Sequence, residues 1–144
     1  ILISQFAPQG YVVLEKLRGE PIGFYRPYVN NEIKAECNWG KLEIDSQRAA
    51  EVFDVAIIIP SKYRVYSTLL DRPVPLAPSR GRKIIASSFL SAGKKAISLE
   101  SLFIEKAKEI IKDGALLYHR DDTHWNAIGI DTSARHIIES MTMH

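Results

Sequence analysis

One short apolar run, VAIIIP at Val55–Pro60, constrains the fold of this chain more than any other sequence feature. The run lacks the alternation of apolar and polar residues that marks a strand with one solvated face. Continuous apolar runs of this length are typical of parallel strands that are covered on both faces. Apolar residues at helical spacing in Ser46–Phe53 indicate a helix directly before it. The sequence therefore predicts a layered α/β arrangement around this strand.

The second half of the chain continues the alternation of strands and helices. Lys94–Leu99 predicts a short strand, and Leu99–Lys112 carries an apolar stripe that predicts a helix, with Gly114 suited to end it. Ala115–Tyr118 predicts another strand, and Ala127–Met141 a final helix that begins at a capping asparagine. The inward face of this last helix is expected to hold Ile130, Ala134, Ile137 and Ile138. We expect a single α/β domain over residues 1–144, with a flavodoxin-like three-layer sheet, whole or incomplete, and helices on both faces.

Other segments give weaker signals. Residues 1–45 are broken repeatedly by Gly and Pro, which predicts irregular structure with short strands. SKYRVY at Ser61–Tyr66 is predicted to be a loop, and Asp71–Arg82 an exposed one because it holds three prolines and a glycine. KIIASSFL at Lys83–Leu90 fits either a short helix or a strand.

Composition narrows the possible partners. The chain has 144 residues, of which 46% are apolar and 25% charged, as in a globular domain. Its net charge of +2, from 19 basic and 17 acidic residues, is too balanced for nucleic acid to be the main partner. The single cysteine, Cys37, excludes an internal disulfide and a cysteine-based zinc site. No apolar run is long enough for a transmembrane segment, and no signal peptide is visible.

Chemistry-bearing side chains are concentrated in YHRDDTHWNAIG at Tyr118–Gly129, which follows a predicted strand. In α/β sheets, functional sites gather at the carboxyl ends of the strands. His119, Arg120 and Asp121, with Asn126 five residues after the aspartate, match the protein-kinase catalytic loop. That loop also requires a Gly-rich phosphate loop, a strand lysine and a D-F-G segment, and the sequence contains none of them.

A metal site is a second hypothesis for this stretch. His119 and His124, with Asp121 or Asp122, are suitable ligand types. However, a spacing of five residues places the two histidines on no common helix face. The sequence therefore favours no metal site.

Acid–base chemistry is the third hypothesis. Asp122 lies two residues before His124, and Asp121 lies three before it. A carboxylate at either distance can hold the imidazole by its Nδ1–H, which leaves Nε2 free to take a proton from a serine hydroxyl. Trp125 could shield the imidazole from water.

These residues carry a resemblance to a known family. The block D-x-H-W followed by a small residue and glycine, at Asp122–Gly129, resembles the signature of the alginate O-acetyltransferase branch of the SGNH-hydrolase-like superfamily. Leu117–Asp121 is similar to the L-Y-Y-R-T that often precedes it. The apolar strand that ends in Pro-x-Lys at Lys62, with Val65–Tyr66 soon after, also matches the pattern. The resemblance covers about residues 50–142.

The resemblance implies an O-acetyltransferase or acetylesterase that acts on a cell-envelope or exported polysaccharide, located in the periplasm or at the envelope. It implies that Asp122 orients His124, which activates a serine, and it implies no metal or dissociable cofactor. Partner proteins of an envelope polysaccharide complex are also implied. The expected substrate-binding residues around this pair are Arg120, Trp125, Lys62 and Tyr66.

The serine itself cannot be identified from the sequence. In this branch the nucleophile lies well after D-x-H-W, but here only Ser133 and Ser140 follow, both in the predicted final helix. Neither G-x-S-x-G nor G-D-S occurs, and Ser4 lacks a preceding Gly-Asp. A non-catalytic glycan-binding or structural α/β domain is therefore the alternative.

Structural roles also remain open for the individual residues. Asp122, Thr123 or Asn126 could simply cap the following helix. Trp125 could serve only in packing, and Lys62 could be a solvated side chain at a strand end.

Overall fold

The elements of the computed structural model are built from residues 11–34 and 37–143, which are the residues the structure describes. In chain order they are β1 (Val12–Leu17), β2 (Glu20–Tyr25), α2 (Arg26–Lys34), α3 (Trp39–Val52), β3 (Val55–Ile58), α4 (Lys62–Tyr66), α5 (Arg80–Ser91), β4 (Lys95–Ser98), α6 (Glu100–Ile110), the 3-10 turn η1 (Ile111–Asp113) and α7 (Ala127–Thr142). Ser4 and the other residues of 1–10 lie outside this part of the chain.

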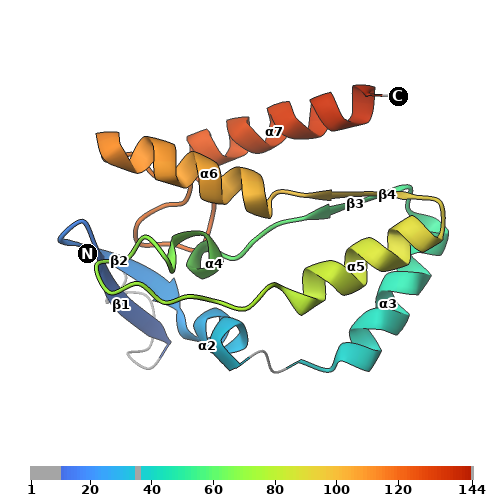
Figure 1. Cartoon of the computed structure of the whole chain (residues 1–144), viewed down its shortest axis with the longest axis horizontal. Helices are drawn as coiled ribbons and strands as arrows, with labels where there is room; N and C mark the ends of the chain where they lie inside the picture. Colours follow the sequence, from blue (N-terminus) through green and yellow to red (C-terminus); the bar gives the residue numbers. More distant parts are fainter. Residues whose placement is uncertain (1–10, 35–36, 144) are drawn as a thin grey trace.

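Strands β3 and β4 form a parallel pair, as the apolar runs predicted. Val55 is opposite Lys95 and Ile58 is opposite Ser98, and the chain crosses from one strand to the other through α4 and α5. Figure 1 shows α6 and α7 on one side of this pair and α3 and α5 on the other. The α/β arrangement is confirmed. The described residues contain two strands of this sheet, so the full three-layer sheet stays a prediction.

Strand β3 was predicted to be buried on both faces, but only one of its faces is well covered. Ala56 is buried in a small cluster with Ala50 of α3 and Phe89 of α5. The next residue points the opposite way, because successive side chains of a strand alternate. Ile57 is 44% exposed and Ile59, just after the strand, is 47% exposed. The prediction of a strand covered on both faces is therefore wrong for the described part of the chain.

The segment before α2 contains short strands, as predicted, and they pair as a regular hairpin. Strands β1 and β2 pair antiparallel with Leu17 opposite Glu20, so Arg18 and Gly19 form a two-residue turn. Both turn residues have positive φ, 53° and 78°, as such turns prefer. The Asp71 carboxylate accepts hydrogen bonds from the backbone N–H groups of Arg18 and Gly19, at 2.8 and 2.9 Å. The hairpin is thereby tied to the loop after α4.

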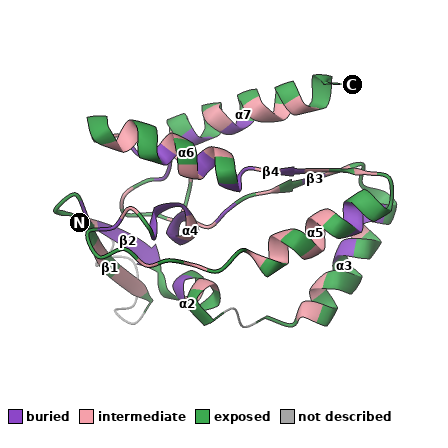
Figure 2. Ribbon diagram, viewed as in Figure 1, coloured by how far each residue is buried: buried purple, intermediate pink, exposed green. Residues whose placement is uncertain are grey.

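The main core lies between this hairpin, α4, α6 and the segment before α7. Its largest fully buried side chains are Tyr66, Tyr118, Phe103 and Leu17. Figure 2 shows the buried residues gathered on α4, β2 and the inner side of α6. The chemistry-bearing loop therefore begins inside the core and not at a solvated strand end.

Two helices begin where loops were predicted. Ser61 accepts a hydrogen bond from the Arg64 N–H at 3.1 Å and starts α4, and Ser79 accepts one from the Arg82 N–H at 3.2 Å and starts α5. Serine is a favoured N-cap, and it overrides the turn signal of the nearby prolines. The loop predictions are wrong for Lys62–Tyr66 and for the last three residues of Asp71–Arg82, and KIIASSFL is helical.

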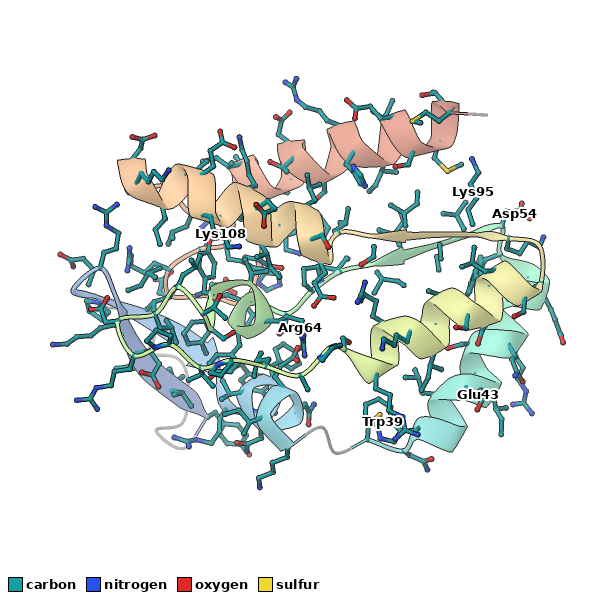
Figure 3. All side chains as sticks on the ribbon, viewed as in Figure 1. Trp39, Glu43, Asp54, Arg64, Lys95 and Lys108 are labelled. Carbon is teal, nitrogen blue, oxygen red and sulfur yellow. The ribbon has the colours of Figure 1, made fainter. Side chains whose placement is uncertain are left out.

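Helix α4 is fixed by a network of partly buried charges. The Arg64 guanidinium lies 2.6 Å from a Glu32 oxygen on α2 and 3.2 Å from a Glu100 oxygen on α6. Figure 3 shows Arg64 directed toward the centre of the molecule. Because Arg64 is held from two sides, the residues at the start of α4 are presented in one orientation.

The C-terminal third contains the two predicted helices and lacks one predicted strand. Helix α6 has the predicted position, and Gly114, with φ of 75°, lies at the end of the turn that follows it. Helix α7 begins after Asn126, as expected. Ala115–Tyr118 is not a strand, since only Tyr118 forms a β-bridge.

The inward face of α7 was predicted correctly at Ile137 and incorrectly at Ile130, Ala134 and Ile138. Gly129 and Ser133 are buried and Ile137 packs against the core, whereas Ile130 and Ile138 are 56% and 62% exposed. The helix turns its smallest residues inward because its first turn lies directly against the backbone of the preceding segment. An apolar stripe on α7 therefore faces outward in the described structure.

Candidate functional site

The loop between the core and α7 is a short antiparallel hairpin. Tyr118 and Trp125 form a β-bridge, and the His119 N–H donates to the His124 carbonyl at 3.0 Å. The four residues between the histidines make the turn. This pairing brings the two ends of the loop together and fixes the direction of the His124 backbone.

Asp122 and His124 are in direct contact. The Asp122 Oδ1 accepts the His124 backbone N–H at 3.0 Å and lies 2.6 Å from His124 Nδ1. An ionised carboxylate is an acceptor only, so Nδ1 carries the proton in this contact and Nε2 has a free lone pair. Partial burial acts to raise the pKa of Asp122, but the hydrogen bonds from His124 outweigh it and lower that pKa. The arrangement can accept a proton at Nε2 and stabilise the resulting imidazolium.

This pair is exposed. The side chain of His124 is 78% accessible and that of Asp122 is 49% accessible. Trp125 does not cover the imidazole, because its ring packs edge-on against Phe103 of α6, with centroids 6.0 Å apart. The predicted shielding of His124 by Trp125 is therefore wrong, and the packing alternative describes Trp125 better.

Lys62 binds the backbone of the loop that carries Asp122 and His124. It is only 4% exposed, so the solvated alternative is wrong. Its ammonium group lies within 3.0 Å of four backbone carbonyl oxygens: those of Gly23 (2.7 Å), His119 (2.6 Å), Arg120 (2.9 Å) and Asp122 (3.0 Å). An ammonium has three hydrogens, so these carbonyls occupy every donor and leave none for a substrate. Burial lowers the pKa of Lys62 to about 8, although the nearby Asp121 and Asp122 charges act to raise it.

Two further predicted substrate contacts also have partners within the protein. Arg120 donates to the Pro21 carbonyl at 3.0 Å, so its side chain lies along the start of β2. Tyr66 is fully buried, and its hydroxyl accepts the Leu117 N–H at 2.8 Å. Burial raises the pKa of Tyr66 to about 12, so it stays neutral. A side chain with no exposed surface cannot contact a substrate, so the prediction for Tyr66 is wrong.

Asn126 and Gly129, which follow the D-x-H-W block, have structural roles at the start of α7. The Asn126 side chain accepts the N–H groups of Ile128 and Gly129 and donates to the Leu116 carbonyl at 2.5 Å. It is the residue that caps α7, so this role falls to neither Asp122 nor Thr123. A Cβ at Gly129 would lie less than 3.0 Å from the Leu117 carbonyl oxygen. Only glycine fits there.

A cavity of about 410 Å³ opens beside the Asp122–His124 pair. Its lining comes from the hairpin, α2, the end of β3, α4 and the loop, and consists of Phe24, Tyr25, Tyr28, Ile59, Pro60, Ser61, Lys62, Tyr63, Tyr118, Thr123, His124 and Trp125. The aromatic residues at positions 24–28 were missed, because residues 1–45 match no known pattern. The closely spaced aromatics Phe24, Tyr25 and Tyr28 were the available signal.

Ser61 is the serine among these lining residues. Its Oγ donates to Glu32 Oε1 at 2.7 Å and accepts the Arg64 N–H at 3.1 Å. Ser133 donates to the Gly129 carbonyl at 2.7 Å and is 1% exposed. Both hydroxyl hydrogens are thus engaged away from His124.

Within 11–34 and 37–143, no group of three or more His, Cys, Asp or Glu side chains is arranged to hold a metal ion. No helix of this part of the chain is long and apolar enough to cross a bilayer.

Comparison with known proteins gives a likeness at the level of fold. No family model matches the chain, and no curated protein matches it. Among solved structures, the chain is similar to the "O-Acetyltransferase Domain of Pseudomonas putida AlgJ", with a TM-score of 0.57 and 21% identity. The match covers 91% of this chain and 47% of that one, so this chain spans about half the length of that domain. The described α/β arrangement is therefore also found in part of an O-acetyltransferase domain.

Proposed function

We propose that this chain is part of an O-acetyltransferase or acetylesterase that acts on a cell-envelope or exported polysaccharide. The observation that carries the proposal is the 2.6 Å contact between Asp122 Oδ1 and His124 Nδ1 at the edge of a cavity. The likeness to an O-acetyltransferase domain and the D-x-H-W block support it. Residues 1–144 would then belong to a single domain of an envelope protein, alongside partner proteins of the same polysaccharide system.

The chemistry follows from the tautomer that Asp122 selects. His124 Nε2 accepts the proton of a serine hydroxyl while the serine oxygen attacks the carbonyl carbon of an acetyl ester. The tetrahedral intermediate collapses, and the imidazolium returns its proton to the departing alcohol. A glycan hydroxyl then attacks the acetyl-serine in transfer, or water does so in hydrolysis, and His124 again takes the proton of the attacking oxygen. The bond between the acetyl group and the serine oxygen breaks, and the imidazolium returns its proton to that oxygen. Asp122 stabilises the imidazolium in both steps.

We assign the nucleophile to a segment outside residues 11–143. Ser61 is at the cavity, but its Oγ both caps α4 and donates to Glu32. Ser133 is buried on the inner face of α7. A serine from elsewhere in a longer protein could approach His124, because 78% of that side chain is accessible.

A non-catalytic glycan-binding domain is the second candidate. The exposure of His124 favours it, because general bases commonly work in sites from which water is excluded. The two candidates differ in one requirement. Only the enzyme needs a serine whose reactivity depends on His124.

Labelling with a serine-reactive fluorophosphonate tests this dependence. The probe is added to a longer protein that contains this chain, with and without His124→Ala, and the adduct is located by peptide mass mapping. We expect one adduct outside residues 11–143 that is lost in the variant. An adduct on Ser61 would contradict our assignment of the nucleophile. Labelling that is unchanged by His124→Ala would contradict the role of the Asp122–His124 pair.

A further inference from the structure

Three exposed tyrosines gather where β1, β2 and α2 meet. The rings of Tyr11 and Tyr25 are nearly parallel, with an interplanar angle of 12° and centroids 6.2 Å apart. Tyr28, from the first turn of α2, stands at 81° to Tyr25 at a centroid distance of 5.2 Å. These side chains are 50%, 38% and 50% exposed, respectively. Below we call them the tyrosine cluster.

The backbone holds the cluster in place. Tyr25 ends β2 directly opposite Val12 of β1, and the Arg26 N–H donates to the Tyr11 carbonyl at 2.7 Å. The neighbouring Phe24 points to the other face of the hairpin, where it packs edge-on against buried Tyr63 at 5.1 Å. One aromatic residue of this stretch thus anchors the hairpin to the core, and the tyrosines beside it face outward.

The cluster adjoins the candidate active site. Tyr25 and Tyr28 line the same cavity as His124. At about 410 Å³ the cavity lies within the roughly 300–1,000 Å³ typical of small-molecule sites. The charged lysine of its lining, Lys62, is fully occupied by backbone carbonyls. Aromatic faces and hydroxyl groups therefore dominate what a ligand would meet at the mouth.

These surfaces match a sugar ring. One face of a pyranose presents C–H groups, which are attracted to the negative face of an aromatic ring, while its hydroxyls radiate from the edge. Tyrosine offers an apolar ring and a hydroxyl that can bond such a group. Contiguous exposed aromatic surface also marks binding sites more often than it arises by chance.

We propose that the tyrosine cluster binds a pyranose unit of the glycan and presents it to His124 across the shared cavity. This inference rests on the proposed function for the identity of the glycan, and it adds the residues that position it. Tyr25 and Tyr28 would be substrate-positioning residues, because they touch the sugar and not the acetyl group.

Binding is measured first, on His124→Ala, so that turnover does not interfere. The probes are three hexasaccharides: neutral cellohexaose, N-acetylated chitohexaose and acidic oligomannuronate. Saturation-transfer NMR and titration give the affinity of each probe for the His124→Ala parent. The same measurements are made on three double variants, in which Tyr25→Ala, Tyr25→Phe or Phe53→Ala is combined with His124→Ala. Phe53 is a matched exposed aromatic, 61% exposed at the end of α3. Circular dichroism confirms that each variant is folded.

We expect at least one probe to bind, and Tyr25→Ala to weaken it about tenfold, since the stacked ring supplies the contact. Tyr25→Phe should restore binding to within about threefold, and Phe53→Ala should leave it unchanged. The inference is overturned if no probe binds, or if folded Tyr25→Ala binds as the parent does. In an active longer protein, Tyr28→Ala should raise KM and leave kcat within about twofold.

The two proposals fail in different ways. Sugar binding that depends on Tyr25, without labelling that depends on His124, would support the tyrosine cluster and contradict the enzyme. Labelling that depends on His124, with sugar binding indifferent to Tyr25, would do the reverse.

Discussion

Substitution of Gly129 by alanine tests the packing that positions the Asp122–His124 loop. The new Cβ would lie less than 3.0 Å from the Leu117 carbonyl oxygen and 3.2 Å from the Trp125 Cβ. Real Cβ contacts are rarely closer than 3.4 Å, so the Leu117 backbone would have to move by on the order of 1 Å. That carbonyl also accepts the Asn126 N–H at 2.9 Å, across the base of the loop.

The magnitude follows from three contributions. Overpacking of this kind costs about 1–3 kcal/mol. Loss of the Asn126–Leu117 backbone hydrogen bond costs about 1 kcal/mol more. Alanine regains up to about 1 kcal/mol because it is the better helix former. The net loss in the free energy of unfolding is therefore about 1–4 kcal/mol, which lowers Tm by about 3–4 °C per kcal/mol for a chain of this size.

Thermal and urea unfolding of Gly129→Ala beside Gly81→Ala gives the assay. Gly81 is also in the first turn of a helix, α5, but a Cβ there would meet only side-chain atoms at 3.6 and 3.7 Å. We expect Gly81→Ala to be neutral or stabilising by up to about 1 kcal/mol. If Gly129→Ala is as stable as Gly81→Ala, the close approach of α7 to the loop is wrong.

Three further predictions concern the groups that hold the loop. Lys62→Met should lower the free energy of unfolding by about 2–4 kcal/mol in urea melts, because it leaves buried carbonyls without a donor; an unchanged midpoint would contradict its role. Titration of Lys62 followed through its side-chain carbon and nitrogen resonances by NMR of isotope-labelled protein should give a pKa near 8, and an ordinary lysine value would refute its burial. As pH rises, Lys62 loses its proton at a lower pH in the folded chain than in the unfolded chain. The resulting contribution of Lys62 to the free energy of unfolding is fully present above about pH 10.5 and is lost as pH falls through 8. Asn126→Ala and Asn38→Ala each remove the N-cap of a helix, α7 and α3 respectively. Asn126→Ala should lower the free energy of unfolding by about 1 kcal/mol more, because the Asn126 side chain also donates to the Leu116 and Tyr118 carbonyls. Equal losses of stability in thermal unfolding would contradict this role of Asn126.

Local patterns account for what the sequence predicted well. The strands around Val55 and Lys95, helix α6 and the Asn126 cap depend on residues within one turn or one strand of each other. The contact between Asp122 and His124 likewise spans two residues, so it could be anticipated.

Long-range packing decided the rest. Lys62 is buried because the carbonyls that it binds come from residues 39 positions before it and 57 to 60 after it. The inward face of α7 was mispredicted for a similar reason, since the position of Leu117 selects Gly129 over Ile130. The tyrosine cluster was missed because it forms only when β1, β2 and α2 come together.

The rate of acetyl ester hydrolysis tests the central claim most directly. The enzyme that is proposed to contain this chain is compared with its His124→Ala and His119→Ala variants at equal folded concentration. His119 is a matched control, since its exposed side chain lies in the same loop but outside the cavity lining. We expect His124→Ala to lower kcat/KM by about 10²–10⁴-fold, and His119→Ala to leave it within about threefold. A folded His124→Ala variant that is as active as His119→Ala would show that the Asp122–His124 pair is not the catalytic base.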